Sequence, residues 1–131
     1  LKVLISKKNL TNNVFLIGRI QNVYPYMKNA KALILSSLWE EVGFVIVEAA
    51  FSNLFVISSN CPNGPKEFLE NGKAGYLFES NKKDNLTEKL IYFIQKEQSL
   101  KSLTIRAKKN SANYTLFRHY LNLQKILSNE N

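Results

Sequence analysis

Short runs of apolar residues alternate along the chain with segments whose apolar positions recur at helical spacing. A continuous apolar run predicts a strand that is buried on both faces. Such runs lie at Val14–Ile17, Ala32–Leu35, Leu54–Ile57 and Gly75–Phe78. Helical spacing or helix-opening residues predict helices at about 22–29, 65–69, 84–94, 100–112 and 116–127. Strands separated by helices predict a Rossmann-like α/β fold, in which helices flank a parallel sheet.

The segment Phe44–Phe51 fits two structures. Its run of Val45, Ile46 and Val47 favours a strand by propensity, in a hairpin with Leu54–Ile57. Gly43 before the segment favours a helix, and so does a composition that is apolar nearly all round, as in a helix buried between a sheet and a partner domain. We predict a helix.

The composition fits one domain with a real core, since 45% of the 131 residues are hydrophobic. The chain opens on Leu1 and is apolar at once, so we expect a fragment of a longer protein. No apolar run is long enough for a membrane span, and the start does not read as a signal peptide. The lone Cys61 suits a reducing cytoplasm, and with the only histidine, His119, far along the chain we expect no catalytic thiol.

The formal net charge of +8 is compatible with anionic partners, namely nucleic acid, an anionic membrane face or phosphorylated ligands. A basic nucleic-acid-binding or membrane-binding module is therefore one alternative, and its candidate residues are Lys101, Arg106, Lys108, Lys109, Tyr114, Phe117, Arg118 and Tyr120. Against stacking on bases, Leu116, Tyr120, Leu123 and Leu127 share one helical stripe, which predicts packing in the core. We favour a solvated basic surface and expect no nucleic acid.

The stretch from Ser36 to Ala49 carries the candidate chemistry. Glu40 and Glu48 are separated by seven residues, with Gly43 between them at the predicted helix start. Ligands of open parallel sheets bind beyond the carboxyl ends of strands, and a helix N-terminus there suits a diphosphate. Glu48 is the only charge in an apolar helix and could accept from a ribose diol. Glu48 could equally cap a neighbouring backbone group or pair with a lysine.

The pattern of Glu40, Gly43, Glu48 and Ala49 resembles the Glu-x7-Glu signature of retaining GT-B glycosyltransferases, specifically glycosyltransferase family 4. Further segments resemble those of the family in the same order, namely Val14–Gly18, Tyr24–Ala30, Ser59–Glu67 and Gly72–Leu77. The Ser59–Glu67 segment is similar to that of bacterial members that build surface polysaccharides. Glu41 departs from the family pattern, which usually has glycine there, and nothing before Val14 resembles its phosphate-binding Gly-Arg…Lys segment.

The resemblance implies that residues 1–131 form an incomplete nucleotide-sugar (donor) binding domain, most simply for a UDP-sugar. Glu40 would contact the sugar and Glu48 the ribose hydroxyls. The remaining site residues would be Gly43, Phe44 and Val45 at the diphosphate, and Gly18, Arg19 and Ile20 at the base. The family generally needs no bound metal.

By the same resemblance, the intact enzyme would transfer the sugar to a glycan or lipid-linked acceptor with retention of configuration. It would work in the cytoplasm, with a peripheral contact to the inner membrane face. The N-terminal acceptor domain is expected to be absent from this chain, so no catalytic residue is assigned and the isolated chain is expected to be inactive. A non-catalytic nucleotide-binding α/β domain is the third alternative.

Overall fold

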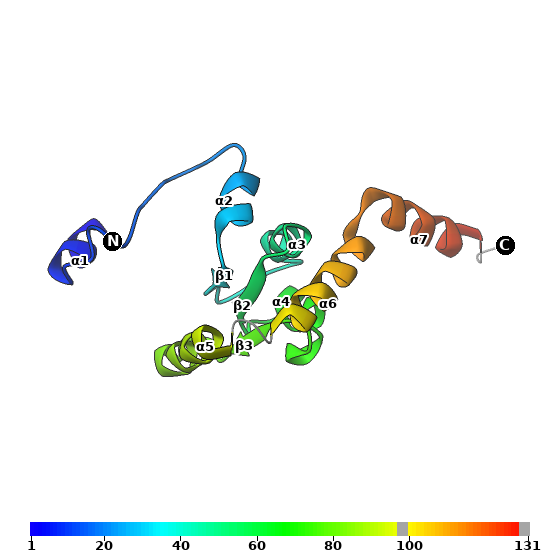
Figure 1. The fold of residues 1–131 in the computed structure, drawn as a ribbon. Helices are drawn as coiled ribbons and strands as arrows, with labels where there is room; N and C mark the ends of the chain where they lie inside the picture. The colour runs from blue at the N-terminus through cyan, green and yellow to red at the C-terminus, as the bar shows by residue number, and fades with distance from the viewer. Residues whose placement is uncertain (97–99, 129–131) are drawn as a thin grey trace.

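Three parallel strands form the centre of the molecule (Figure 1). The computed structural model describes residues 1–96 and 100–128. The strands are β1 (Ala32–Leu35), β2 (Phe55–Ser59) and β3 (Tyr76–Phe78), in the order β1-β2-β3. Leu35 is in register with Ser58, and Ser59 is in register with Phe78. The carboxyl ends of all three strands therefore lie at one edge of the sheet, and three of the four predicted strands are confirmed.

Helices connect the strands and cover the sheet. The α-helices are α1 (Lys2–Lys7), α2 (Tyr24–Asn29), α3 (Phe44–Phe51), α4 (Gly64–Phe68), α5 (Lys83–Lys96), α6 (Lys101–Ser111) and α7 (Leu116–Ser128). The 3-10 helices η1 (Glu70–Gly72) and η3 (Ala112–Tyr114) lie within the described residues. The predicted α/β fold, a parallel sheet flanked by helices, is confirmed.

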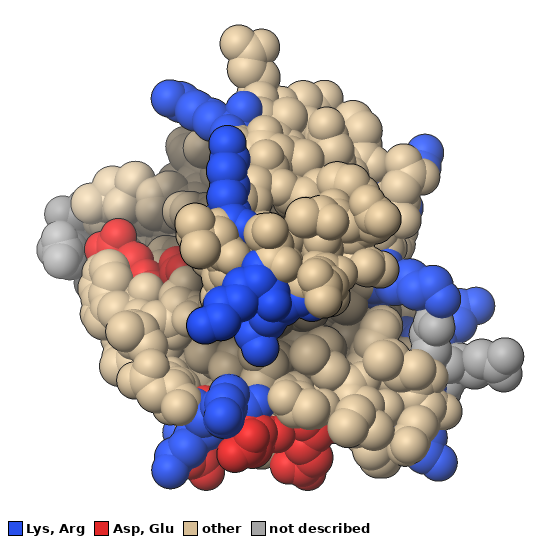
Figure 2. Space-filling view, turned by 90° about the vertical axis from the view of Figure 1, so that its left-hand side faces the viewer, with Lys and Arg blue, Asp and Glu red and all other residues tan. Residues whose placement is uncertain are grey.

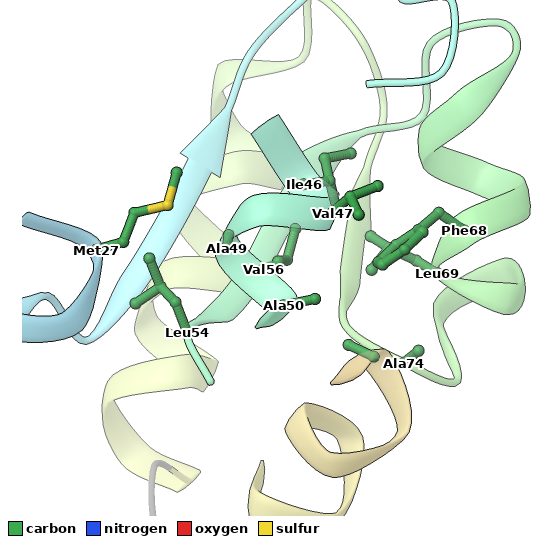
Figure 3. Close-up of a cluster of buried hydrophobic side chains, with 11 residues drawn as sticks. Met27, Ile46, Val47, Ala49, Ala50, Leu54, Val56, Phe68, Leu69 and Ala74 are labelled. Carbon is green, nitrogen blue, oxygen red and sulfur yellow. The ribbon is translucent and has the colours of Figure 1, made fainter. Parts of the chain in front are cut away.

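The core is divided between the two faces of the sheet, because side chains alternate along β2. Phe55 and Ile57 point to one face, where Phe93 of α5 lies 5.2 Å from Phe55 between ring centroids. Val56 points to the other face, into the larger cluster shown in Figure 3. That cluster contains Met27, Ile46, Val47, Ala49, Ala50, Leu54, Val56, Phe68, Leu69, Ala74 and Ala107. Helices α3 and α6 pack against each other over this second face.

The ambiguous segment is helical, as predicted. Ile46 and Val47 of α3 are buried, at 0% and 5% exposure, and Ala49 and Ala50 are fully buried. The small alanines allow the helix to approach the sheet closely, while the branched side chains fill the space beside Leu69. Burial on several sides of α3 therefore outweighs the strand propensity of its β-branched residues.

The prediction of a strand at Val14–Ile17 is wrong. All four residues are exposed, and the segment belongs to an irregular connection between α1 and α2. Figure 1 shows this connection running apart from the sheet. A strand needs a hydrogen-bonded neighbour, and within the described residues none lies beside this segment. The apolar run is present, but the pairing that would make it a strand is not.

The prediction that α7 packs in the core is also wrong. Leu116, Tyr120, Leu123 and Leu127 are exposed, from 46% to 89% of each residue. Helix α7 follows η3 and projects from the body of the molecule (Figure 1). Its apolar stripe is real, but no other element of residues 1–96 and 100–128 covers it enough to bury a residue. Within the same residues, no helix is both long and apolar enough to cross a membrane.

Charged side chains are spread over the surface. Figure 2 shows Lys and Arg side chains at several places on one face, with tan surface between them and Asp and Glu side chains near its lower edge and on its left side. On this face the basic side chains are therefore distributed over several places.

One polar cluster fixes α6 to the segment after α4. Glu70 accepts hydrogen bonds from Arg106 Nε at 2.7 Å and from Arg106 Nη2, and Asn110 Nδ2 donates to Glu70 Oε1 at 2.7 Å. Asn110 also donates to the Phe68 carbonyl at 3.0 Å. The hydrogen bonds from Arg106 and Asn110 lower the pKa of Glu70 from the ordinary 4.5. The pair is exposed to solvent, so its contribution to stability is screened.

The lowered pKa of Glu70 makes the pair's contribution depend on pH. The ionised carboxylate is favoured in the folded state, so the contribution is present above pH 4.5 and is lost as the pH falls through the lower folded pKa. We expect Glu70→Gln to be less stable than wild type at pH 7 and to approach wild type at pH 3. Urea unfolding of both proteins at the two pH values measures this, and an equal difference at both would contradict it.

Candidate functional site

The loop between β1 and α3 lies at the carboxyl edge of the sheet. Gly43 is its last residue and the N-cap of α3, with φ 68° and ψ 52° in the left-handed region that favours glycine. Helix α3 has no side-chain cap, and its amide groups at Phe44 and Val45 have no acceptor within the helix. These two N–H groups and the positive end of the helix dipole form a favourable place for an anion.

Glu40 is half-buried in the same loop and held by a serine. Ser37 Oγ donates a hydrogen bond of 2.6 Å to Glu40 Oε1. The Ser37 carbonyl in turn accepts from Ser59 Oγ at 2.5 Å, and Ser59 is the last residue of β2. The end of β2 therefore supports the loop that follows β1.

The start of α4 holds the loop at a second point. Gly64 N donates to the Glu41 carbonyl at 2.8 Å. A Cβ on Gly64 would lie 2.9 Å from that oxygen and closer still to the Val42 carbonyl. Glycine is therefore required at position 64 by close backbone approach. The side chain of Glu41, which departs from the family pattern, is exposed.

Gly64→Ala is expected to lower the free energy of unfolding by about 1–3 kcal/mol, because the added methyl group meets rigid backbone. Chemical denaturation with urea measures the change. Lys66→Ala, an exposed change in the same helix, serves as the matched control and should alter stability little. Equal stability of Gly64→Ala and wild type would show that the loop moves away at no cost.

Glu48 lies in α3, a little over one turn from Gly43, and is half-buried. Its backbone carbonyl accepts from Ser52 N at 3.0 Å and from Ser52 Oγ at 2.9 Å. Among the residues that the structure describes, its side-chain carboxylate has neither a hydrogen-bond nor an ion-pair partner. The two alternatives of a backbone cap and a lysine pair therefore find no support within residues 1–96 and 100–128.

The predicted site residues fall into two groups. Glu40, Gly43, Phe44, Val45 and Glu48 are brought together by one loop and the first turns of one helix. Gly18, Arg19 and Ile20 lie in the connection that precedes α2, and no hydrogen bond within the described chain joins them to that loop. Gly18 has φ 66° and open space around it. A role for these three residues at the base stays a prediction.

Three further residues support the site and were not predicted from the sequence, namely Ser37, Ser59 and Gly64. The only local signal was Ser37, three positions before Glu40. Ser59 and Gly64 contact the loop from other elements, and the hydrogen bond from Ser59 to Ser37 spans 22 positions.

An open hollow of about 460 Å³ lies beside Ser59 and Gly64 and is lined by Asn60, Cys61, Pro62, Asn63, Lys66, Glu67 and Asn71. Cys61 is buried and free.

Metal ligands do not gather near this loop or elsewhere in residues 1–96 and 100–128. No group of three or more His, Cys, Asp or Glu side chains in this part of the chain could hold a metal ion. Independence of donor binding from metal stays a prediction, which titration with and without a chelator can test.

Relatives of known sequence share parts of this chain. The chain is 44% identical over 69 residues to an uncharacterized glycosyltransferase of Methanocaldococcus jannaschii, covering 53% of this chain and 17% of that one. It is 27% identical over 107 residues to a poly(ribitol-phosphate) α-N-acetylglucosaminyltransferase of Staphylococcus aureus, covering 82% and 22%. The chain therefore spans less than a quarter of the length of these relatives.

A solved structure shares the fold over almost the whole chain. HepE of Anabaena, crystallised in complex with UDP, superposes with a TM-score of 0.88 at 22% identity, covering 98% of this chain and 35% of that one. The parallel sheet with its flanking helices is thus the fold of a GT-B glycosyltransferase. The family model "Glycosyl transferases group 1" matches residues 1–110. Since that match covers most of the described sheet and helices, the chain belongs to the group 1 glycosyltransferases.

Proposed function

We propose that this chain is the donor-binding part of a retaining glycosyltransferase of family 4 that uses a UDP-sugar. The observation that carries the proposal is the juxtaposition of Glu40, the uncapped start of α3 and the unpartnered Glu48 carboxylate at the carboxyl edge of the sheet. Ligands of open α/β sheets bind at this edge. The complex of HepE with UDP supports the choice of nucleotide.

The diphosphate would lie at the start of α3. The N–H groups of Phe44 and Val45 would donate to phosphate oxygens, and the helix dipole would favour the negative charge. Gly43 permits the close approach because it has no side chain and adopts a left-handed conformation. As the bond between the anomeric carbon and the diphosphate breaks, the same groups would stabilise the charge of the leaving UDP.

The ribose would lie over Glu48 and the sugar near Glu40. A half-buried carboxylate without a partner is unfavourable, and two ribose hydroxyls would supply hydrogen-bond donors to it. Glu40 Oε1 accepts from Ser37, which leaves Oε2 for a hydroxyl of the sugar. Gly18, Arg19 and Ile20 would approach the base.

The acceptor would bind outside this chain. The chain spans only 35% of HepE and 22% of the staphylococcal relative, so acceptor binding and turnover belong to a larger protein. The staphylococcal relative is by its name a transferase of N-acetylglucosamine to poly(ribitol-phosphate). For the larger protein we propose a glycan or lipid-linked acceptor, used in the cytoplasm with a peripheral contact to the inner membrane face. We expect residues 1–131 alone to bind donor without transferring sugar.

Titration of UDP into the purified chain, followed by NMR, tests the proposal. We expect saturable shifts around Gly43–Glu48, and about fivefold to tenfold weaker binding in Glu48→Gln, because the charge-assisted hydrogen bonds to the ribose are lost. Glu41→Gln removes the same charge from an exposed side chain and is the matched control, with affinity within about twofold of wild type.

Two results would contradict the proposed site. The first is a folded wild-type chain that shows no shifts with UDP or another nucleoside diphosphate. The second is a Glu48→Gln variant that binds UDP as tightly as wild type, which would place the ribose elsewhere. Circular dichroism of each protein establishes that it is folded before the titration.

A further inference from the structure

Two hydrogen bonds in series connect the core of the sheet to the Glu40 carboxylate. Ser59 ends β2 and is 1% exposed, and its hydroxyl donates to the Ser37 carbonyl at 2.5 Å. Ser37 Oγ then donates to Glu40 Oε1 at 2.6 Å. Each serine therefore has a defined acceptor, and the second bond ends on a charged group of the candidate site.

The hydrogen bond from Ser59 fixes the backbone of Ser37, the residue whose side chain donates to Glu40. Ser58, the residue before Ser59, is in register with Leu35 at the end of β1, and the chain leaves the sheet directly after that pair. At this point the parallel ladder no longer holds the loop. The Ser59 hydroxyl, at the end of the neighbouring strand β2, holds the Ser37 carbonyl in place of a backbone hydrogen bond between the strands. Because Ser59 is buried in β2, it gives the loop a rigid point of attachment.

The second bond restricts the side chain of Glu40. A glutamate on an irregular loop has several rotatable bonds and would sample many rotamers. Within the described residues, Glu40 Oε1 has this one side-chain hydrogen bond, and Glu40 forms no ion pair. The hydroxyl of Ser37 is thus the group that sets where the carboxylate lies before any ligand arrives.

We infer that Ser37, itself held by Ser59, is a positioning residue that pre-orients the Glu40 carboxylate for the sugar of the donor. The inference rests on the proposed function for the identity of the ligand. It predicts that the Ser37 hydroxyl matters for the sugar and not for the nucleotide, because in the proposed site α3, which begins after Gly43, would bind the diphosphate and the ribose. Preorganisation of this kind acts on affinity by reducing the entropy lost on binding.

Ser37→Ala and Ser37→Thr form the test pair, since threonine keeps the hydroxyl. In the ligand-free chain, three-bond couplings of the Glu40 side chain report its rotamers. We expect a dominant rotamer in wild type and Ser37→Thr, and averaged couplings in Ser37→Ala. Ser59→Ala should show the same averaging. Ser58→Ala, a change at the adjacent buried serine whose hydroxyl donates to the Ser59 carbonyl, should not.

Donor binding supplies the second measurement. Dissociation constants are determined for UDP, UDP-glucose and UDP-N-acetylglucosamine. We expect Ser37→Ala to weaken binding of the preferred UDP-sugar about fivefold to tenfold, while UDP affinity stays within about twofold and Ser37→Thr restores the sugar affinity. A merely structural role for Ser37 would lower the affinities for UDP and UDP-sugar together.

The outcomes separate this inference from the proposed function. Unchanged Glu40 couplings in Ser37→Ala would overturn the positioning role, as would unchanged UDP-sugar affinity in a variant that still binds UDP. Failure of the wild-type chain to bind UDP would overturn the proposed function, and the ligand-free couplings alone would then decide whether Ser37 orders Glu40. If Ser59→Ala does not fold, the Ser37 pair still decides the inference.

Discussion

Phe68→Ala is expected to lower the free energy of unfolding by about 3–5 kcal/mol, the largest change in stability that we predict. Phe68 is the last residue of α4 and is 2% exposed. Figure 3 shows it beside Leu69, on the side of the cluster that faces Ile46 and Val47 of α3. Its ring centroid lies 5.4 Å from that of Tyr114. Alanine would leave a cavity between α3, α4 and η3.

Urea unfolding followed by circular dichroism measures the effect. Phe117→Ala is the matched control, because Phe117 is 69% exposed on α7 and its removal should change stability by less than about 0.5 kcal/mol. Similar losses in the two variants would contradict the packing described for Phe68. If Phe68→Ala is unfolded without denaturant, Phe68→Leu keeps much of the volume and should give a smaller, measurable loss.

The same substitution is expected to reach the candidate site. Phe68 ends the helix that Gly64 begins, and Gly64 N holds the Glu41 carbonyl at 2.8 Å. Loosening α4 in the core would therefore loosen the loop that carries Glu40. Changed amide shifts of Glu41 and Val42 in the Phe68→Ala spectrum would reveal this coupling. Unchanged shifts there would show that the substitution disturbs only the C-terminal end of α4.

Much of the fold could be predicted from local patterns because the elements involved bury nearly all of their side chains. The run Leu54–Ile57 is buried throughout, so its apolar pattern is continuous and predicts a strand. The helix at Phe44–Phe51 was harder to predict, since Val45, Ile46 and Val47 favour a strand by propensity. The segment is apolar on nearly all sides of the helix, and this composition favours a buried helix. The full burial of Ala49 and Ala50 explains it.

The wrong predictions share one physical cause. Val14–Ile17 and the apolar stripe of α7 have the pattern of buried elements, yet the described residues supply no partner for either. Periodicity reports which face of a segment is apolar, and it does not report whether another element is available to cover that face. A prediction of burial is therefore only as good as the assumption that the covering element is present.

The candidate site was predictable where its residues are close in sequence. Glu40, Gly43 and Glu48 lie on one loop and one helix, so spacing alone places them near each other. The supporting contacts from Ser59 and Gly64 arise because the carboxyl ends of β1 and β2 lie side by side. That proximity follows from strand order, which no local pattern specifies.

Gly43→Ala is expected to weaken UDP binding at least tenfold, a larger loss than that of any other single change predicted at the site. The left-handed conformation at φ 68° costs an alanine about 1–2 kcal/mol. Its Cβ would also lie 3.3 Å from Ile46 Cδ1, a tight contact with a side chain that is fully buried. We expect the peptide groups at the start of α3 to rotate in response, which would turn the N–H groups of Phe44 and Val45 away from the proposed position of the diphosphate.

Gly72→Ala separates backbone strain from damage to the site. Gly72 also has a positive φ, 93°, but a Cβ there meets nothing within 4 Å, and the residue lies in η1, outside the candidate site. Both variants should lose about 1 kcal/mol or more of stability, measured by urea unfolding. Only Gly43→Ala should lose UDP affinity, measured by the same NMR titration. If both variants bind UDP like wild type, the diphosphate does not lie at the start of α3, and the positive end of that helix serves only the fold.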